Sequence, residues 1–278
     1  MRVGLVQMTS SDDPSENLAS ATTFVEKAVA GGARFVLTPE VTNCVSASRP
    51  RQNEVLTYEA DDPTLSALRK LAKAHDIWLL IGSLALKSGD DDRFVNRSLL
   101  IAPSGEVAAR YDKMHMFDVA LSETETYRES DGYKPGDRAV VSHVDGTGVG
   151  LTVCYDVRFP YLYRDLAQAG ASMLTVPSAF SPDTGPMHWE PLLRARAIET
   201  GCFVLAPAQT GEHTASRGRA RQTWGHSLAI DPWGRVIADG GTAQGVVFAD
   251  LDLAMVAQTR RRLPSLTHDR AFRSAGDG

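Results

Sequence analysis

The sequence predicts an α/β fold, and three observations support this prediction. In the N-terminal half, apolar stretches of strand length alternate with stretches whose apolar residues recur at helical spacing. The middle of the chain carries several strand-like runs, and the alternation returns after them. The 278 residues contain no linker-like stretch, so we expect one domain spanning residues 1–278. Two layers of sheet, each covered by helices, fit this order.

The N-terminal elements form a β-α-β pattern followed by a second helix. The first helix has a well-marked start, because Asp13 can cap it, Pro14 suits its first position and Glu16 has capping-box spacing from Asp13. Asp62 and Pro63 repeat this signal. The expected elements are strands at 2–8, 34–38 and 77–83, and helices at 15–30 and from residue 63 onward.

The rest of the chain predicts a sheet-rich middle and a second alternating region. The expected strands lie at 94–102, 106–111, 139–144, 149–155, 171–177, 202–208, 224–231, 235–239 and 245–253. The turn-like residues 145–148 join two of these strands as a hairpin. Helices are expected at 160–169 and 189–199, and an arginine-rich helix is expected to end at Pro264.

Composition favours small-molecule chemistry. Lys and Arg total 29 against 34 Asp and Glu, and the basic residues are scattered, which argues against nucleic-acid binding. No segment approaches the length of a membrane span, and a strand begins almost at Met1, so we expect a cytoplasmic protein. The histidines lack HExxH spacing and no GxSxG occurs, which argues against a metalloamidase and a serine hydrolase.

The three cysteines lie far apart and are odd in number, so each is expected to be a free thiol. Cys154 follows an apolar strand and precedes a polar turn, where backbone N–H groups can face a reacting carbonyl. This position favours a nucleophile, and the alternative is a packed strand cysteine. Cys202 lies in an apolar strand and is expected to be an inert core thiol. Cys44, in a polar loop, receives no role.

Two charged residues occupy positions unusual for solvated side chains. Glu40 follows the strand at 34–38 and a proline, so its carboxylate stands at the C-terminal end of a buried strand; the alternative is a turn or a helix cap. Lys113 lies between a strand and a partly apolar segment, so it is expected to be buried against a carboxylate such as Glu40 or Glu129. Its alternative is a surface ion pair.

Three segments resemble, in order and spacing, the signatures of the nitrilase superfamily: LTPE at 37–40, YDKMH at 111–115 and VCYDVRFP at 153–160. Further similar blocks extend the resemblance over nearly the whole chain. The resemblance implies a four-layer α-β-β-α sandwich, a homodimer or higher homo-oligomer, and hydrolysis of a linear carbon-nitrogen bond. Among the branches, the chain is most similar to amidases acting on deaminated glutathione and on ω-amides of 2-oxo acids.

The resemblance also implies roles for individual residues. Glu40 is the general base, Lys113 binds the oxyanion, Cys154 attacks the carbonyl, and Glu129 orients Lys113 or the substrate. The chemistry is consistent with these roles, because a carboxylate can accept the thiol proton while the lysine and the N–H of Tyr155 hold the oxyanion. No metal and no organic cofactor is expected.

Substrate-binding residues are expected beyond the nucleophile. Arg158 is placed to bind a substrate carboxylate bidentately, and its alternative is a salt bridge with Asp156. Phe180 and His188 lie in blocks that resemble pocket-lining segments of the family, although a packed aromatic residue and a capping histidine are the simpler interpretations. The expected partner is a small-molecule amide that carries a carboxylate.

Two features separate the chain from its nearest branch. Met187 replaces a small residue before HWE, and the loop at 211–224 is longer and contains arginines that either meet a carboxylate or are solvated. The alternatives for function are an N-carbamoyl amino acid amidohydrolase, a nitrilase, and a catalytically silent scaffold. Tyr155 and Asp156 argue against the nitrilase, which usually carries Trp-Glu after its cysteine.

Overall fold

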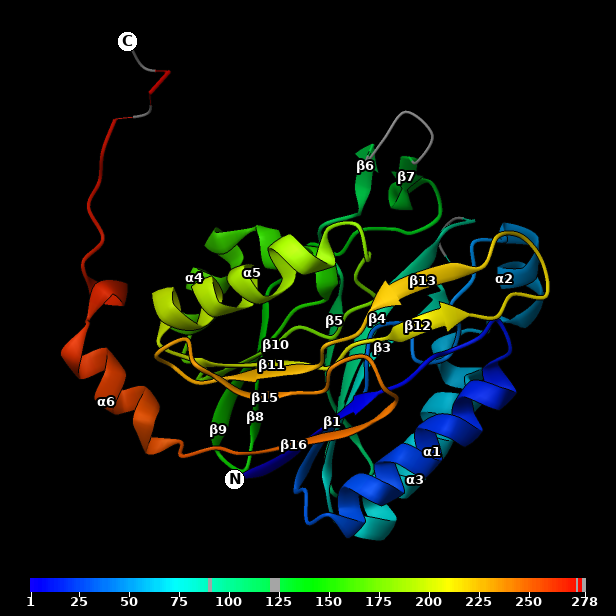
Figure 1. Cartoon of the computed structure of the whole chain (residues 1–278), viewed down its shortest axis with the longest axis horizontal. Coiled ribbons are helices and arrows are strands. Elements are labelled where there is room, and N and C mark those ends of the chain that lie inside the picture. Colours follow the sequence, from blue (N-terminus) through cyan, green and yellow to red (C-terminus); the bar gives the residue numbers. More distant parts are fainter. Residues whose placement is uncertain (90–91, 121–125, 274, 277–278) are drawn as a thin grey trace.

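Two six-stranded sheets pack against each other at the centre of the molecule (Figure 1). The computed structural model describes residues 1–89, 92–120, 126–273 and 275–276. One continuous apolar core contains side chains of both sheets, for example Leu37 of the first and Leu151 of the second, which are fully buried.

The first sheet has the order β16-β1-β2-β3-β4-β5. Its strands are β1 (Arg2–Gln7), β2 (Phe35–Leu37), β3 (Trp78–Lys87), β4 (Phe94–Ile101), β5 (Val107–Asp112) and β16 (Gly245–Asp250). Strands β1, β2 and β3 are parallel, and the other neighbours are antiparallel. The central parallel strands point their carboxyl ends toward the same edge, where ligands bind in open α/β sheets.

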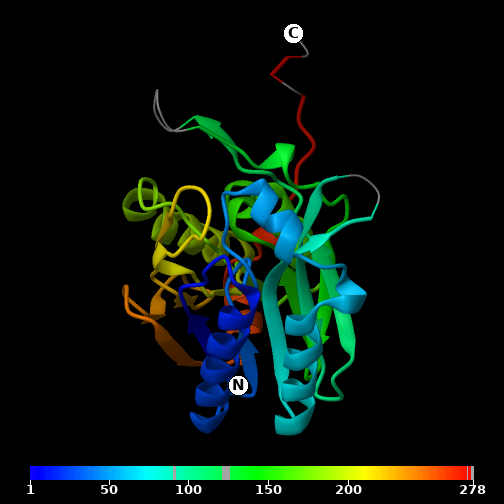
Figure 2. The ribbon, with the colours of Figure 1, turned by 90° about the vertical axis from the view of Figure 1, so that its right-hand side faces the viewer.

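Helices α1 (Pro14–Ala30) and α3 (Pro63–His75) cover the outer face of this sheet (Figure 2). Val25 of α1 and Leu68 of α3 are fully buried in one cluster with the strand residue Ile81. Burying such a side chain contributes about 1.5–3 kcal/mol. The expected start of α1 is confirmed, because the Asp13 carboxylate accepts the Ser15 N–H at 2.8 Å.

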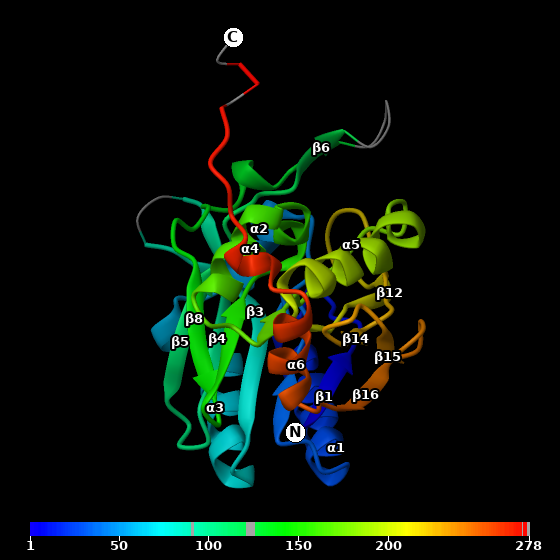
Figure 3. The ribbon, with the colours of Figure 1, turned by 90° about the vertical axis from the view of Figure 1, so that its left-hand side faces the viewer.

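The second sheet has the order β15-β14-β11-β10-β9-β8. Its strands are β8 (Val140–Val144), β9 (Thr147–Leu151), β10 (Met173–Thr175), β11 (Phe203–Ala206), β14 (Leu228–Ile230) and β15 (Val236–Asp239). Helices α4 (Pro160–Gln168) and α5 (Gly185–Thr200) cover it, and α6 (Ala254–Arg262) lies at its side (Figure 3). The four-layer α-β-β-α sandwich implied by the sequence is confirmed.

Several short elements surround the edge of the sheets from which the site is built. They are α2 (Arg49–Val55), the hairpin of β6 (Asp118–Ala120) and β7 (Thr126–Arg128), the hairpin of β12 (Thr210–His213) and β13 (Arg221–Trp224), and the single turns η1 (Glu59–Asp61), η2 (Glu129–Asp131), η3 (Cys154–Arg158) and η4 (Ser265–Thr267). The sequence patterns did not predict α2 or either hairpin, because each is short and lacks a sustained apolar period.

Several predicted boundaries are wrong. The strand expected at 77–83 extends to Lys87, and the strand expected at 224–231 is divided between β13, which ends at Trp224, and β14 (Leu228–Ile230). The strand expected at 149–155 ends at Leu151, because Cys154 has φ of +49°, which extended backbone cannot adopt. The helix expected at 189–199 begins at Gly185, since Pro186 suits the first helical turn. Within the described residues, no helix combines the length and the apolar character needed to cross a bilayer.

Candidate active site

Glu40 lies in a tightly packed loop after β2. Its side chain is 4% exposed, and its carboxylate accepts the Asn96 amide at 2.9 Å and the Ala179 backbone N–H at 2.8 Å. The loop approaches β3 so closely that a Cβ at Gly82 would stand 2.0 Å from the Thr38 carbonyl oxygen, and only glycine leaves room for this approach. The backbone therefore holds the carboxylate in one place.

Lys113 follows β5 directly and is 3% exposed. Its ammonium donates to Glu40 Oε1 at 3.0 Å and to both carboxylate oxygens of Glu129 at 2.8 Å. Glu129 comes from η2, and its Oε2 also accepts the Phe117 backbone N–H at 2.7 Å. Lys113 is buried against a carboxylate, as the sequence predicts, and both candidate partners, Glu40 and Glu129, hold its ammonium.

Cys154 begins η3, just beyond the end of β9. Its N–H donates to the Pro177 carbonyl at 3.0 Å, and its left-handed backbone turns the chain sharply at this point. The buried carboxylate of Asp156 supports the turn by accepting the Val153 N–H at 2.8 Å and the Tyr111 hydroxyl at 2.6 Å. Since Tyr111 lies two residues before Lys113, Asp156 ties the cysteine turn to the lysine segment.

Charge compensation keeps the buried pair ionised. Burial by itself raises the pKa of Glu40, but the positive charges of Lys113 and Arg221 outweigh burial and hold that pKa below its ordinary value. Burial lowers the pKa of Lys113, whereas Glu129 and Glu40 raise it well above the usual range. Near neutral pH, Glu40 is therefore a carboxylate and Lys113 an ammonium.

The thiol of Cys154 is protonated at rest. Burial raises its pKa far above the ordinary value, the negative charge of Glu40 raises it further, and Lys113 opposes this only in part. The Glu40 carboxylate lies close enough to the thiol to act directly on its pKa. An ionised carboxylate in contact with a neutral thiol can accept its proton when the sulfur attacks an electrophile.

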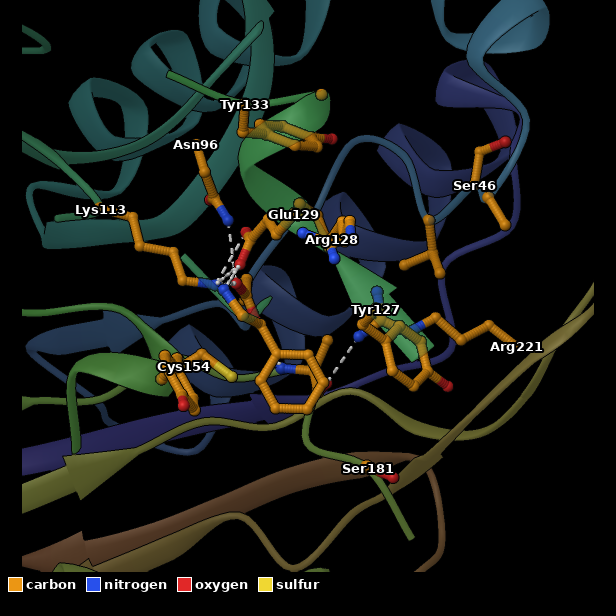
Figure 4. Close-up of a pocket in the computed structure, with 18 of the residues that line it drawn as sticks. Ser46, Asn96, Lys113, Tyr127, Arg128, Glu129, Tyr133, Cys154, Ser181 and Arg221 are labelled. Atoms are coloured by element: carbon orange, nitrogen blue, oxygen red, sulfur yellow. Dashed lines mark hydrogen bonds and ion pairs between the residues drawn. The ribbon is translucent and has the colours of Figure 1, made fainter. Parts of the chain in front are cut away.

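A cavity of about 460 Å³ opens in front of these groups. Figure 4 shows Lys113, Glu129 and Cys154 converging at one end, whereas Tyr127 and Arg221 lie at the other. Its volume suits a small linear ligand.

The cavity receives only some of the predicted substrate-binding residues. Tyr155 and Phe180 line it. Arg158 and His188 are not among the described residues that line it; they contact each other at 3.3 Å, and the Arg158 guanidinium stacks near the rings of Tyr155 and Phe180. The alternative salt bridge with Asp156 is absent from the described residues, where Asp156 binds Tyr111 and His115 instead.

Sequence patterns did not identify four further polar residues of the cavity. Asn96 lies inside β4, Arg49 opens α2, and Tyr133 and Arg128 flank η2. These positions carry no local signal, because a strand, a helix start and a turn each accept such residues for ordinary structural reasons. Arg221 does belong to the loop at 211–224 that was singled out for its arginines, and it lines the cavity.

The other two cysteines differ from Cys154. Cys202 is fully buried in the core, as predicted. Cys44 is 1% exposed and lines the cavity, and burial together with the charge of Asp12 raises its pKa to about 12. Its thiol is therefore neutral at physiological pH.

The fold and the site together define a thiol-dependent hydrolase built on an α-β-β-α sandwich. Residues 2–261 match the family model of carbon-nitrogen hydrolases. The chain is 37% identical over 270 residues to the deaminated glutathione amidase of Yersinia enterocolitica. The aligned region covers 96% of this chain and 92% of that protein. The chain belongs to the carbon-nitrogen hydrolase family, as the resemblance implied, and it is a cysteine-dependent amidase.

Two solved structures have the same fold. Saccharomyces cerevisiae Nit3, a member of branch 10 of the nitrilase superfamily, superposes with a TM-score of 0.85 at 28% identity, over 98% of this chain and 97% of that one. A variant of the amidase from Nesterenkonia sp. AN1 gives a TM-score of 0.78 at 27% identity, over 95% of this chain and 98% of that one. Acrylamide has added to the active site cysteine of that amidase.

Proposed function

We propose that this amidase hydrolyses small linear amides that carry a carboxylate, of the kind represented by deaminated glutathione and by ω-amides of 2-oxo acids. The observation that carries the proposal is the state of Arg221. It lines the cavity and donates to the Ala179 carbonyl at 3.2 Å, and among the described residues no carboxylate pairs with it. A guanidinium without a carboxylate partner in a cavity is suited to bind a carboxylate of a ligand.

In the proposed acylation step, the Cys154 sulfur forms a bond to the amide carbon while the thiol proton moves to Glu40. The Lys113 ammonium and the Tyr155 N–H stabilise the oxyanion that develops. Glu40 then gives the proton to the nitrogen, the carbon-nitrogen bond breaks, and the amine leaves. The geometry supports these roles, because Glu40 contacts both the thiol and Lys113.

The deacylation step uses the same groups. Glu40 takes a proton from water, whose oxygen attacks the thioester carbon, and the carbon-sulfur bond breaks as the proton returns to sulfur. Glu129 is a positioning residue here, since its two oxygens hold the Lys113 ammonium at 2.8 Å. A carboxylic acid is released, and the free thiol is restored.

A substrate panel tests the proposal. Deaminated glutathione, 2-oxoglutaramate, N-carbamoyl amino acids and simple nitriles are compared by the release of amine or ammonia, with Cys154→Ala as the blank. We expect the two 2-oxo acid amides to have the highest kcat/KM. We also expect Arg221→Gln to raise their KM about tenfold, because a charge-assisted contact is lost. Preferred turnover of nitriles or N-carbamoyl amino acids would replace this proposal by one of the alternatives.

We also propose that the protein forms a homodimer or a higher homo-oligomer through its helices. Met187 and Ile198 on α5 and Tyr161 on α4 are more than half exposed, with 74%, 52% and 64% of their surface accessible. Exposed apolar side chains on these two helices are consistent with self-association. Light scattering coupled to size exclusion measures the mass directly. The cytoplasmic location stays a prediction, which cell fractionation tests.

A further inference from the structure

A second cavity of about 530 Å³ adjoins the catalytic one. The two cavities share the lining residues Ala47, Thr126, Tyr127, Ser181 and Arg221. Figure 4 shows Tyr127 and Arg221 at the end of the catalytic cavity that lies away from Lys113. The second cavity therefore continues the first, beyond the end opposite the catalytic groups, and we call it the outer cavity.

The outer cavity is formed largely by the β12–β13 hairpin and the segment after Ser181. Glu212 and Gln222 contribute from the paired strands, and Arg219 contributes from the loop between them. Most of its lining side chains are polar, in contrast to the apolar surface expected for a buried core or a lipid-binding groove. This composition suits a polar ligand that remains in contact with water.

The charges of the outer cavity are of both signs. Asp183 accepts the Ser181 hydroxyl at 3.2 Å, and Glu212 accepts the Gln222 amide at 3.2 Å. Arg219 is exposed, and it forms no ion pair with any carboxylate in the described part of the chain. Arg221 also lines this cavity, but the proposed function assigns it to the carboxylate of the acyl half. Asp183, Glu212 and the Arg219 guanidinium remain, and they complement a zwitterion, whose ammonium and carboxylate groups are a short distance apart.

We propose that the outer cavity is the subsite for the amine half of the substrate, and that Arg219 binds the terminal carboxylate of an amino acid or dipeptide that leaves as the amine. This inference rests on the proposed function. The catalytic groups do not distinguish a peptide-like leaving group from ammonia. The inference assigns that distinction to Arg219.

The order of the chemical steps supports this placement. After the carbon-nitrogen bond breaks, the acyl half stays bonded to Cys154, whereas the amine must depart before water can attack. The amine half therefore needs a path to solvent that is open while the acyl half still occupies the catalytic cavity. The outer cavity provides such a path, because its lining includes the exposed residues Arg219, Asp183 and Gln222.

The length of the leaving group decides whether Arg219 can affect substrate binding. An extended dipeptide spans up to about 7 Å, whereas ammonia occupies only the position of the scissile nitrogen. Cysteinylglycine, the amine half of deaminated glutathione, is therefore long enough to extend from the scissile nitrogen into the outer cavity, whereas ammonia released from 2-oxoglutaramate is not. These two amides share one acyl half, so a comparison between them isolates the outer cavity.

The test measures kcat and KM for both amides with the full-length enzyme, Arg219→Gln and the control Arg217→Gln. Arg217 lies in the same loop, pairs with Glu54 at 3.4 Å, and is not among the described residues that line either cavity. We expect Arg219→Gln to raise KM about tenfold for deaminated glutathione, with kcat unchanged, and to leave 2-oxoglutaramate unaffected. Arg217→Gln should leave both amides unaffected.

A second measurement uses the product itself. Cysteinylglycine should inhibit the turnover of 2-oxoglutaramate by the wild type, and its C-terminal amide should inhibit less, because the carboxylate is removed. Arg219→Gln should abolish the difference between the two inhibitors.

Two results would overturn the inference while leaving the proposed function in place. In the first, the wild type hydrolyses both amides, but Arg219→Gln changes the KM of neither amide or changes the KM of both by the same factor. The other is equal inhibition by cysteinylglycine and its amide. If the wild type hydrolysed neither amide, the proposed function would fail, and the assignment of the outer cavity would fail with it.

Discussion

Cys154 and Cys202 are two buried thiols in the same half of the molecule, and they have opposite surroundings. Cys154 is 8% exposed and Cys202 is fully buried. Burial raises the pKa of both thiols. A lowered resting pKa therefore does not distinguish Cys154, the proposed nucleophile, from the core cysteine Cys202.

The two thiols differ in whether a ligand can reach the sulfur and in whether a carboxylate lies beside it. Cys154 lies beyond the end of a strand, faces a cavity and contacts the Glu40 carboxylate. Cys202 contacts the Ala171 carbonyl at 3.3 Å and the Arg260 guanidinium at 3.0 Å, and it is not among the described residues that line either cavity. The comparison teaches that a high-pKa thiol becomes a nucleophile when a substrate can reach it and an ionised base can take its proton.

The largest effect should come from deleting the two sulfurs in turn. Cys154→Ala should reduce amide turnover to the uncatalysed background, because no thioester can form. Cys202→Ala should keep kcat and KM within about twofold, since its sulfur contacts neither cavity nor base. Steady-state kinetics with purified variants measures both. Turnover by Cys154→Ala that matched the wild type would refute the distinction between the two thiols.

The next effect concerns the base and its dependence on pH. The pKa of Glu40 is held below its ordinary value, so the ionised base should be present throughout the neutral range. We expect kcat/KM to be level near neutral pH and to fall only at a pH below the ordinary pKa of a glutamate, where Glu40 becomes protonated. Glu40→Gln should lower kcat by about 10²–10⁴-fold and remove this acidic limb. A pH profile measured on both proteins checks the prediction, and an acidic limb that persisted in Glu40→Gln would contradict it.

The same groups make stability depend on pH with a definite sign. The lowered pKa of Glu40 means that its contribution is complete above the pKa of the unfolded chain and is lost as pH falls through the folded value. The raised pKa of Lys113 means that its contribution is complete below the unfolded pKa and is lost as pH rises through the folded value. The buried pair therefore stabilises the fold best between these two limits.

The positions of Cys154, Glu40 and Lys113 beside strands predicted them as site residues, and the resemblance to the nitrilase superfamily implied the role proposed for each. Arg221 and Asn96 reach the cavity only through tertiary packing, so the periodicity of apolar residues and the spacing of motifs in the sequence do not predict their position. Arg158 shows the converse. It lies four residues after Cys154 in the turn η3, but its side chain contacts His188 and is not among the described residues that line the cavity. Closeness in sequence to a catalytic residue does not fix the direction of a side chain.

The smallest effect is on stability, and it reverses the order of the two cysteines. Cys202→Ala should lower the free energy of unfolding by about 1–2 kcal/mol, because a core cavity forms and the Arg260 guanidinium loses a contact. Cys154→Ala should change it by less than about 0.5 kcal/mol, since its sulfur already faces an open cavity. Urea unfolding followed by fluorescence gives both values, provided that the slope with denaturant is unchanged. Equal destabilisation by the two substitutions would mean that Cys154 is packed like a core residue, and the functional contrast would then need another cause.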